Sequence, residues 1–325
     1  MKRASLAVAI AALAALPTVA SADGLPVLGI DGGDGVVSAA GASRYVTFAS
    51  GHDTVVARLH TKDAAVARSR SIRGLFTVPI VAYDGSASGL SADQRTLVVI
   101  RSRTRFPQPR THLAILDARR LTVSRYITLR GDFSFDAVSP DGSSVYLVNY
   151  LSRDPTDYAV RALDVRSGRL LPHPVVDPHE PDEKMRGMPV TRASSADGRW
   201  AYTLYSSEKP FIHALDTSSG TARCIDVDAA SGNRDLFLLK LRLRDGGRTL
   251  AVVHGKHPLA LVDTSTFEVS APAGPAPARP AAHAPAADRG LPWIESAAVA
   301  LLLLLGAAVV RARRTGPFAR RARAR

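Results

Sequence analysis

Four stretches of this chain repeat one pattern: SADQRTLVVI (Ser91–Ile100), SPDGSSVYLVNY (Ser139–Tyr150), SADGRWAYTLYS (Ser195–Ser206) and RDGGRTLAVVHG (Arg244–Gly255). A fainter copy, GASRYVTFAS, covers Gly41–Ser50. Each copy is a polar turn followed by a run of residues that favour strands. The turn aspartates Asp93, Asp141, Asp197 and Asp245 follow one another at intervals of 48, 56 and 48 residues. A repeat of about 50 residues predicts a series of equivalent small sheets.

A second phrase follows each first one and supplies two more strands joined by a turn after an aspartate: AILDARRLTV, RALDVRSGRL, HALDTSSGTA and ALVDTSTFEV. A further strand precedes each turn of the first phrase: TVPIVAYDG, GDFSFDAVSP, GMPVTRASSA and LFLLKLRLRD. Four strands in about 50 residues is the content of one β-propeller blade. We therefore predict an all-β fold, a ring of five four-stranded blades, with six as the alternative if Val27–Ile30 belongs to a further set of strands.

The SPDG turn at Ser139–Gly142 and the LD-x-x-x-G phrase at Leu163–Gly168 resemble WD40-like and YVTN-type repeats of bacterial exported propellers, over roughly residues 40–270. The asparagine-containing strand typical of that family is matched only at Tyr146–Asn149. Taken with its two ends, the chain is similar to membrane-anchored, exported propellers of actinobacteria. The resemblance implies a propeller fold and no catalytic residue.

The first 22 residues have the layout of a secretory signal peptide. Lys2 and Arg3 begin it, an Ala-rich apolar stretch extends from Leu6 to Leu16, and Ala20-Ser21-Ala22 supplies a cleavage site. We expect cleavage after Ala22 and export of the chain from Asp23 onward.

The other end predicts a membrane anchor. Ser296–Val310 carries no charge, and Trp293 stands where interfacial aromatics are favoured. Seven arginines and no acid come after Val310, which predicts that the tail 311–325 is cytoplasmic. We expect a transmembrane helix over 293–310, a Pro/Ala-rich spacer over 271–292, and a propeller ectodomain over 23–270 outside a single-pass, type I cell-membrane protein.

This topology changes the meaning of the net charge of +13. Residues 23–292 hold 33 basic and 28 acidic residues, a net charge of only +5. Most of the excess therefore orients the chain in a membrane, and we expect no nucleic-acid partner. The single cysteine, Cys224, cannot form an internal disulfide.

The unusual side chains belong to one face of the predicted propeller. Connections in a four-stranded blade alternate between two faces, so the Asp/Gly turns share one face and the long loops share the other. We predict that the long-loop face forms a polar entrance and binds a ligand or partner. Its candidate binding residues are Arg101, Arg103, Arg105, Arg110, Asp177, His179, Glu180, Asp182, Glu183, Lys209, His254, Lys256 and His257.

Three hypotheses compete for the acidic insert Asp177–Glu183. Asp177, His179 and Glu180 could ligate a metal, or two carboxylates could act as an acid/base pair. The third hypothesis, a solvated loop that pairs with neighbouring arginines, is favoured because surface charges mostly do this. The sequence shows no catalytic motif, and we expect no catalytic set, no cofactor and no metal.

The function predicted is that of an interaction module at the cell envelope, with an envelope protein, a wall polymer or a small ligand as partner. Whether the chain is an enzyme stays open, and the sequence favours that it is not. Two alternatives remain. One is a propeller hydrolase or lactonase that uses the acidic insert with His254 or His257. The other is a structural accessory subunit of an envelope complex.

Overall fold

The computed structural model describes residues 35–182 and 184–272, which belong to one compact unit ending at Pro272. These residues form five antiparallel sheets of four strands each. The predicted signal peptide, the stretch Val27–Ile30, the spacer, the anchor and the tail all lie outside them. In the part of the chain described here, no helix has the length and apolar character needed to cross a membrane.

The strands run through the sheets in chain order, which gives each sheet one repeat of the sequence. Sheet 1 holds β1 (Val36–Val37), β2 (Ser43–Ser50), β3 (Asp53–His60) and β4 (Val66–Arg73). Sheet 2 holds β5 (Phe76–Thr77), β6 (Thr96–Arg101), β7 (Arg110–Asp117) and β8 (Thr122–Arg130). Sheet 3 holds β9 (Asp132–Val138), β10 (Ser144–Tyr150), β11 (Tyr158–Asp164) and β12 (Arg169–Val175).

Sheet 4 holds β13 (Met188–Ser194), β14 (Trp200–Ser206), β15 (Phe211–Asp216) and β16 (Thr221–Asp226). Sheet 5 holds β17 (Leu239–Arg244), β18 (Thr249–His254), β19 (His257–Asp263) and β20 (Val269–Ser270). Three short 3-10 helices lie at Asp228–Ala230, Leu236–Leu238 and Asp245–Gly247. The prediction of five four-stranded units is confirmed for the described residues.

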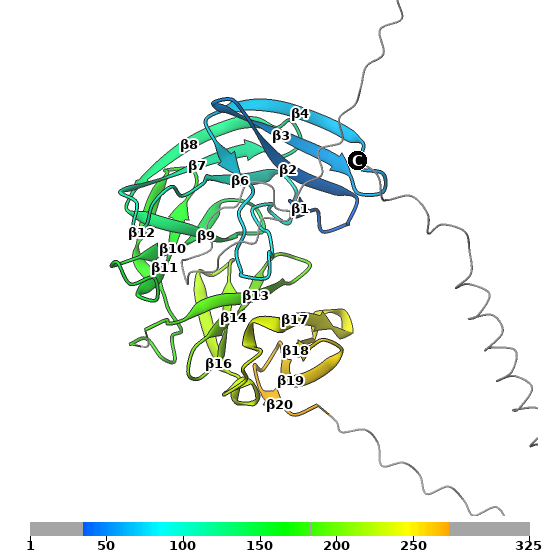
Figure 1. Ribbon diagram of the computed structural model, residues 1–325, viewed down its shortest axis with the longest axis vertical. Helices are drawn as coiled ribbons and strands as arrows, with labels where there is room; N and C mark the ends of the chain where they lie inside the picture. The colour runs from blue at the N-terminus through cyan, green and yellow to red at the C-terminus, as the bar shows by residue number, and fades with distance from the viewer. Residues whose placement is uncertain (1–34, 183, 273–325) are drawn as a thin grey trace, which may run out of the picture. The chain divides into compact units, whose positions relative to one another are not determined.

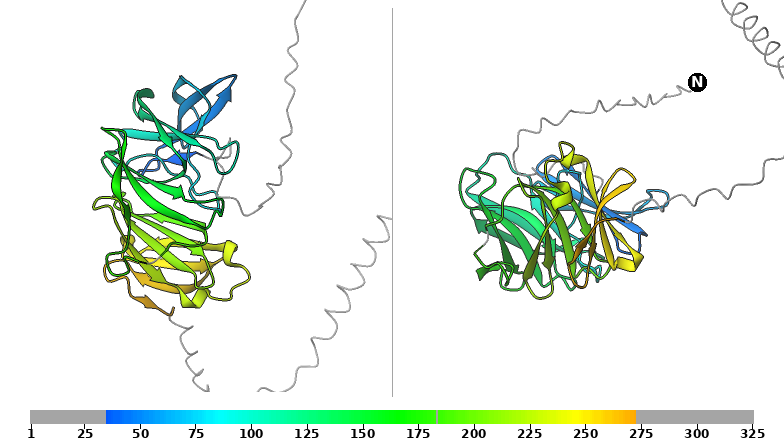
Figure 2. Two further views of the ribbon diagram at one scale, coloured as in Figure 1. Left: turned by 90° about the vertical axis from the view of Figure 1, so that its left-hand side faces the viewer. Right: turned by 90° about the horizontal axis from the view of Figure 1, so that it is seen from below.

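The five sheets follow one another around a common centre as the blades of a propeller do (Figure 1). Figure 2 shows the same succession of sheets from the side and from below. Sheets 1 and 5 stand at the two ends of the series in Figure 1, whereas the sequence predicted a ring in which they meet.

Each interior sheet is apolar on both faces because it packs between two others. In β6, Leu97 packs with Tyr45 and Val56 of sheet 1. The next residue, Val98, points the other way and packs with Phe135 and Leu147 of sheet 3. This two-sided burial explains why the strands read as continuous apolar runs rather than alternating ones.

The SPDG-type turns have the structural role that the sequence predicted. The Asp141 carboxylate accepts hydrogen bonds from the Ser139 hydroxyl (2.7 Å) and the Ser143 backbone N–H (3.0 Å). Gly142 has a φ of 73°, and a Cβ there would overlap the Thr96 side chain of the preceding sheet. The turn therefore packs against its neighbour as well as reversing the chain.

The segment between β5 and β6 leaves sheet 2 and reaches sheet 4 (Figure 1). The backbone N–H groups of Tyr83 and Asp84 donate to the carbonyls of Pro189 (2.8 Å) and Val190 (3.1 Å). The Tyr83 ring contacts Phe237 edge-on at 4.9 Å between centroids. The sequence placed this segment within its own blade, but it also links that blade to two others.

Candidate functional site

A groove of about 720 Å³ lies on the long-loop face over sheets 3 and 4. Three segments form most of it: the β10–β11 loop, the link between β12 and β13, and the β14–β15 loop. Two predicted binding residues, Glu180 and Lys209, come together here. The lining residues are Thr156, Glu180, Lys184, Arg186, Gly187, Ser207, Glu208, Lys209, Phe211 and Asp226.

The groove carries both signs of charge: three acidic and three basic side chains line it, together with one aromatic ring. Phe211, only 9 % exposed, lies at the start of β15. Such a lining can pair with the charges and backbone of an extended polypeptide while the ring supplies an apolar contact.

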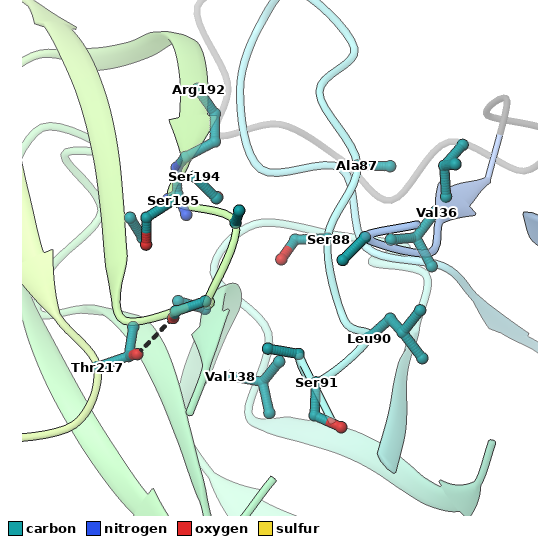
Figure 3. A pocket seen from close by; sticks show the side chains of 17 residues that line it. Val36, Ala87, Ser88, Leu90, Ser91, Val138, Arg192, Ser194, Ser195 and Thr217 are labelled. Carbon is teal, nitrogen blue, oxygen red and sulfur yellow. Dashed lines mark hydrogen bonds between the residues drawn. The ribbon is translucent and has the colours of Figure 1, made fainter. Parts of the chain in front are cut away.

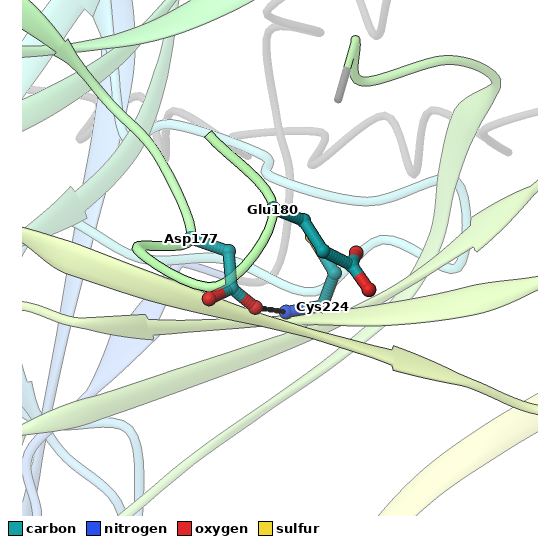
Figure 4. A group of neighbouring side chains, drawn as sticks. All are labelled: Asp177, Glu180 and Cys224. Carbon is teal, nitrogen blue, oxygen red and sulfur yellow. Dashed lines mark hydrogen bonds between the residues drawn. The ribbon is translucent and has the colours of Figure 1, made fainter. Parts of the chain in front are cut away.

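Asp177, at the start of the acidic insert, is buried and holds the insert to β16 (Figure 4). Its Oδ2 accepts a hydrogen bond from the Cys224 backbone N–H (2.9 Å). Its Oδ1 accepts one from the His179 backbone N–H (2.8 Å) and lies 3.0 Å from His179 Nδ1. Burial alone would raise the pKa of Asp177, but these hydrogen bonds hold it below its ordinary value.

The metal hypothesis for this insert named Asp177, His179 and Glu180. The structure instead brings ligand-type atoms of Asp177, Glu180 and Cys224 within 4.8 Å of one another. Both carboxylate oxygens of Asp177 already accept backbone N–H groups, and Arg223 Nη1 lies 3.7 Å from Oδ1. These contacts fit a structural role for Asp177. Asp182 is exposed, and Glu183 lies outside the described residues.

Arg103 turns inward rather than facing the entrance. Its Nε and Nη2 donate to Asp132 Oδ1 at 3.0 and 2.6 Å, and its Nη2 also donates to Ser134 Oγ at 3.1 Å. The guanidinium lies over the rings of Phe106 and Tyr150. The Arg103 and Asp132 side chains are 4 % and 1 % exposed. Arg103 therefore folds the β6–β7 loop onto sheet 3.

The other basic residues of that loop behave differently. Arg101, Arg105 and Arg110 are exposed. Arg110 lies directly opposite Arg130 on β8, and Arg101 lies over the Phe76 ring. They stand on sheet 2 and do not line the groove of sheets 3 and 4.

His254, Lys256 and His257 belong to the β18–β19 hairpin of sheet 5. His254 pairs with His257 across the turn. None of the three lines the groove. The residues predicted to surround one entrance therefore lie in three separate places: the groove, the exposed arginines of sheet 2, and the β18–β19 hairpin.

A cavity of about 320 Å³ on the Asp/Gly-turn face was not predicted (Figure 3). Residues of sheets 1 to 4 line it, among them Val36, Ser88, Val138 and Arg192. Small side chains make up most of its wall, so the sequence offered no sign of it.

Arg192 forms a buried ion pair with Asp136 of the neighbouring sheet, and the two side chains are 5 % and 3 % exposed. Arg192 Nη1 also donates to the Asp136 carbonyl (3.0 Å). Among the described residues, Arg192 Nε and Asp136 Oδ2 are buried without a hydrogen-bond partner. A charged residue inside an apolar inner strand, as in FSFDAV, is the one signal that could have pointed to this pair.

His213 lies close to this ion pair. Burial lowers the pKa of His213 to about 4, and Asp136 and Arg192 contribute opposite electrostatic effects. Its ring packs edge-on against Tyr205. The imidazole is therefore neutral at physiological pH.

No model of a known protein family matches this chain, and no curated protein matches it. Among solved structures, it is similar to the Cps50 (Swd1) β-propeller domain of Myceliophteria thermophila, with 13 % identity, coverage of 73 % of this chain and 69 % of that one, and a TM-score of 0.43.

It is also similar to a functionally unknown protein from Desulfotomaculum acetoxidans DSM 771, with 12 % identity, coverage of 74 % and 68 %, and a TM-score of 0.46. A third is hydrazine synthase of Kuenenia stuttgartiensis, with 15 % identity, coverage of 70 % and 75 %, and a TM-score of 0.38. Since each TM-score is below 0.5, the fold assignment rests on the five sheets of this chain itself.

Proposed function

We propose that this chain is an interaction module on the outer side of the cell membrane, and that the groove over sheets 3 and 4 binds an extended segment of a partner protein. The observation that carries the proposal is the meeting of three loops in one open, mixed-charge groove that Phe211 helps to line. The leader at 1–22 and the apolar segment 293–310 with its arginine tail support the location.

The chemistry of the groove supports binding of a polypeptide more than catalysis. The Asp177 carboxylate already accepts hydrogen bonds from the backbone N–H groups of Cys224 and His179. The two histidines of the hydrolase hypothesis, His254 and His257, lie on sheet 5 and not at the acidic insert. Two acidic residues, Glu180 and Glu208, line the groove together with three basic ones. Such a lining suits a partner that carries both signs of charge.

Site-directed photo-crosslinking in cells tests this proposal. A photoreactive residue replaces Ser207 in the groove of the full chain, and a second variant carries it at Ser265, in the β19–β20 turn on the opposite face. We expect a discrete adduct from position 207 only, and its loss when Lys209→Glu is combined with Glu180→Lys.

Equal adducts from both positions, or an adduct that survives the charge reversal, would contradict the groove as the binding site. Location has its own test, in which a cysteine-labelling reagent that cannot cross membranes is applied to whole cells carrying Ser265→Cys. Labelling only after lysis would contradict an extracytoplasmic position.

A further inference from the structure

The net charge of the described unit is concentrated in its first two sheets. Residues 35–130 hold 15 basic and 5 acidic residues, whereas residues 131–272 hold 16 basic and 19 acidic residues. The positive charge of the unit therefore belongs to sheets 1 and 2.

Six exposed or half-exposed arginines lie on the two sheet faces that are turned toward each other. On sheet 1, Arg58 and Arg68 share a cross-strand row with the core residue Tyr45, and Arg70 shares one with Val56. Paired residues point to the same side of a sheet, so these arginines face sheet 2.

The same register argument applies to sheet 2. Arg110 and Arg130 are directly opposite and stand four rows beyond the pair Ala114–Tyr126, on the same side of the sheet, while Arg101 lies two positions after Val99. Ala114 and Val99 pack toward sheet 1, so these three arginines face it too. We call this set of side chains the arginine seam; it consists of Arg58, Arg68, Arg70, Arg101, Arg110 and Arg130.

The outer strands of the two sheets, β4 and β8, lie side by side along this seam (Figure 1). Arg70 Nε donates to the Arg120 carbonyl across it (3.3 Å). The pair Arg58–Arg68 stands toward one end of the strands and the pair Arg110–Arg130 at the other. Strands of eight or nine residues place the two pairs roughly 20 Å apart.

Carboxylates are missing from the seam in the described part of the chain. The strand acids Asp53 and Asp117 occupy rows that point to the other faces. None of the six arginines forms an ion pair among the described residues, whereas Arg120 outside the seam pairs with Asp117 (3.1 Å). Like charges directly opposite each other cost stability. Two such pairs on neighbouring sheets favour a ligand that supplies the opposite charge.

We propose that the arginine seam binds a linear, base-free phosphodiester chain, the chemistry of a polyol-phosphate wall polymer, an inference that rests on the proposed extracytoplasmic location. A guanidinium fork matches phosphate oxygens in a bidentate manner, and phosphodiesters keep their charge at any physiological pH. The arginines are spread along the strands of two neighbouring sheets, an arrangement that favours a chain lying along the strands over a flat membrane surface.

The local electrostatics agree with this arrangement. His112 lies between Arg101 and Arg110, with its Nδ1 3.0 Å from Thr128 Oγ1. Burial, then the positive charges of Arg101 and Arg110, lower its pKa. A lower pKa favours the neutral imidazole, so the positive potential of the seam comes mainly from the arginines.

A fluorescently labelled poly(glycerol phosphate) oligomer, titrated into the full-length chain in detergent at several salt concentrations, tests the proposal. The seam variant replaces Arg58, Arg68, Arg110 and Arg130 by Ser. The control variant replaces four exposed arginines elsewhere, Arg166, Arg169, Arg234 and Arg244, by Ser. Both variants lose the same formal charge, so the comparison isolates position from net charge.

We expect the seam variant to lose at least about tenfold in affinity and the control to lose far less. The slope of log affinity against log salt should fall by about 3 in the seam variant, since each phosphate contact contributes about 0.7 for a single strand. Thermal melting should show that the seam variant is folded, because it removes two like-charge pairs.

Equal losses in both variants, or unchanged binding in the seam variant, would overturn the proposal. Equally tight, seam-dependent binding of poly-L-glutamate would overturn the phosphodiester class. Tighter binding of a single-stranded DNA oligonucleotide at matched charge would contradict the proposal and favour a nucleic acid as the ligand. Equal binding of phosphatidylglycerol vesicles would contradict it in favour of a membrane surface. The photo-crosslink at position 207 is measured in a separate experiment. A negative result for partner binding in the groove can therefore be distinguished from a negative result for ligand binding at the seam.

Discussion

Asp84 and Lys240 are 156 positions apart in the chain, yet Lys240 Nζ donates a hydrogen bond to Asp84 Oδ2 at 3.0 Å. The same oxygen accepts a hydrogen bond from the Thr191 hydroxyl at 2.7 Å. One carboxylate at the tip of the β5–β6 segment therefore joins sheet 2 to sheets 4 and 5. This contact crosses the centre of the propeller. Packing between neighbouring sheets does not make such a connection.

Replacing Asp84 by Ala should destabilise the whole unit. The change leaves the Lys240 ammonium and the Thr191 hydroxyl without their acceptor, which costs about 2–3 kcal/mol. Asp63→Ala, at an exposed turn, is the matched control and should change the free energy of unfolding by less than about 0.5 kcal/mol. Urea unfolding followed by fluorescence measures both, and equal midpoints for the two variants would show that the centre-spanning contact adds nothing.

The same residue predicts a response to acid. Burial alone would raise the pKa of Asp84, but hydrogen bonds from Ser86, Thr191 and Lys240 hold it below the ordinary 3.8. A lowered folded pKa gives stability that is fully present above pH 3.8 and is lost as the pH falls through the folded value. The Asp84→Ala variant should therefore differ least from the wild type in the most acidic samples.

His213 predicts a second loss of stability on acidification, in a pH range above the one in which Asp84 titrates. Its pKa is about 4 in the fold against an ordinary 6.5, so the unfolded chain binds the additional proton. Stability is complete above pH 6.5 and falls as the pH drops toward 4, by on the order of 3 kcal/mol. In urea titrations across this range, His213→Phe should flatten the decline, whereas the exposed His173→Gln should not. A decline that persists in His213→Phe would place its origin elsewhere.

The strands and turns could be predicted because each repeat carries its own local signal. Asp141 closes its turn through Ser139 and Ser143, all within five residues, and so do Asp93 and Asp197 through their own neighbours. Asp245 is the exception: it has a φ of 53° and starts a short 3-10 helix. Its turn sequence RDGG lacks the serine that caps the other three.

The candidate site could be predicted only in part, since its geometry depends on contacts between distant residues. The sequence placed Glu180 and Lys209 on one face, and the groove contains both. It could not show that Arg103 would meet Asp132, 29 residues away, and leave the surface. Nor could it show that Arg58 and Arg110, on different sheets, would face the same seam, because strand register decides this.

Gly142 tests how closely neighbouring sheets pack. An Ala there must adopt a φ of 73° and also place its Cβ against the Thr96 side chain. Gly232→Ala is a matched control, since Gly232 has a φ of 68° with open space around it. We expect about 1 kcal/mol for the control and about 1–3 kcal/mol more for Gly142→Ala. Thermal melting of both variants checks the difference, and equal losses would mean that the turn does not press on the next sheet.

The buried ion pair between Asp136 and Arg192 should cost more when one partner is removed than when both are. Arg192→Met alone leaves the Asp136 carboxylate buried without its partner, and we expect a loss of about 3–5 kcal/mol. Combining it with Asp136→Val should restore most of that stability, because the pair already has two unsatisfied buried atoms and replacing both charges removes their desolvation cost. A double-mutant cycle from urea unfolding measures the coupling. A double variant as unstable as Arg192→Met would show that the charges contribute more to the fold than the apolar side chains that replace them.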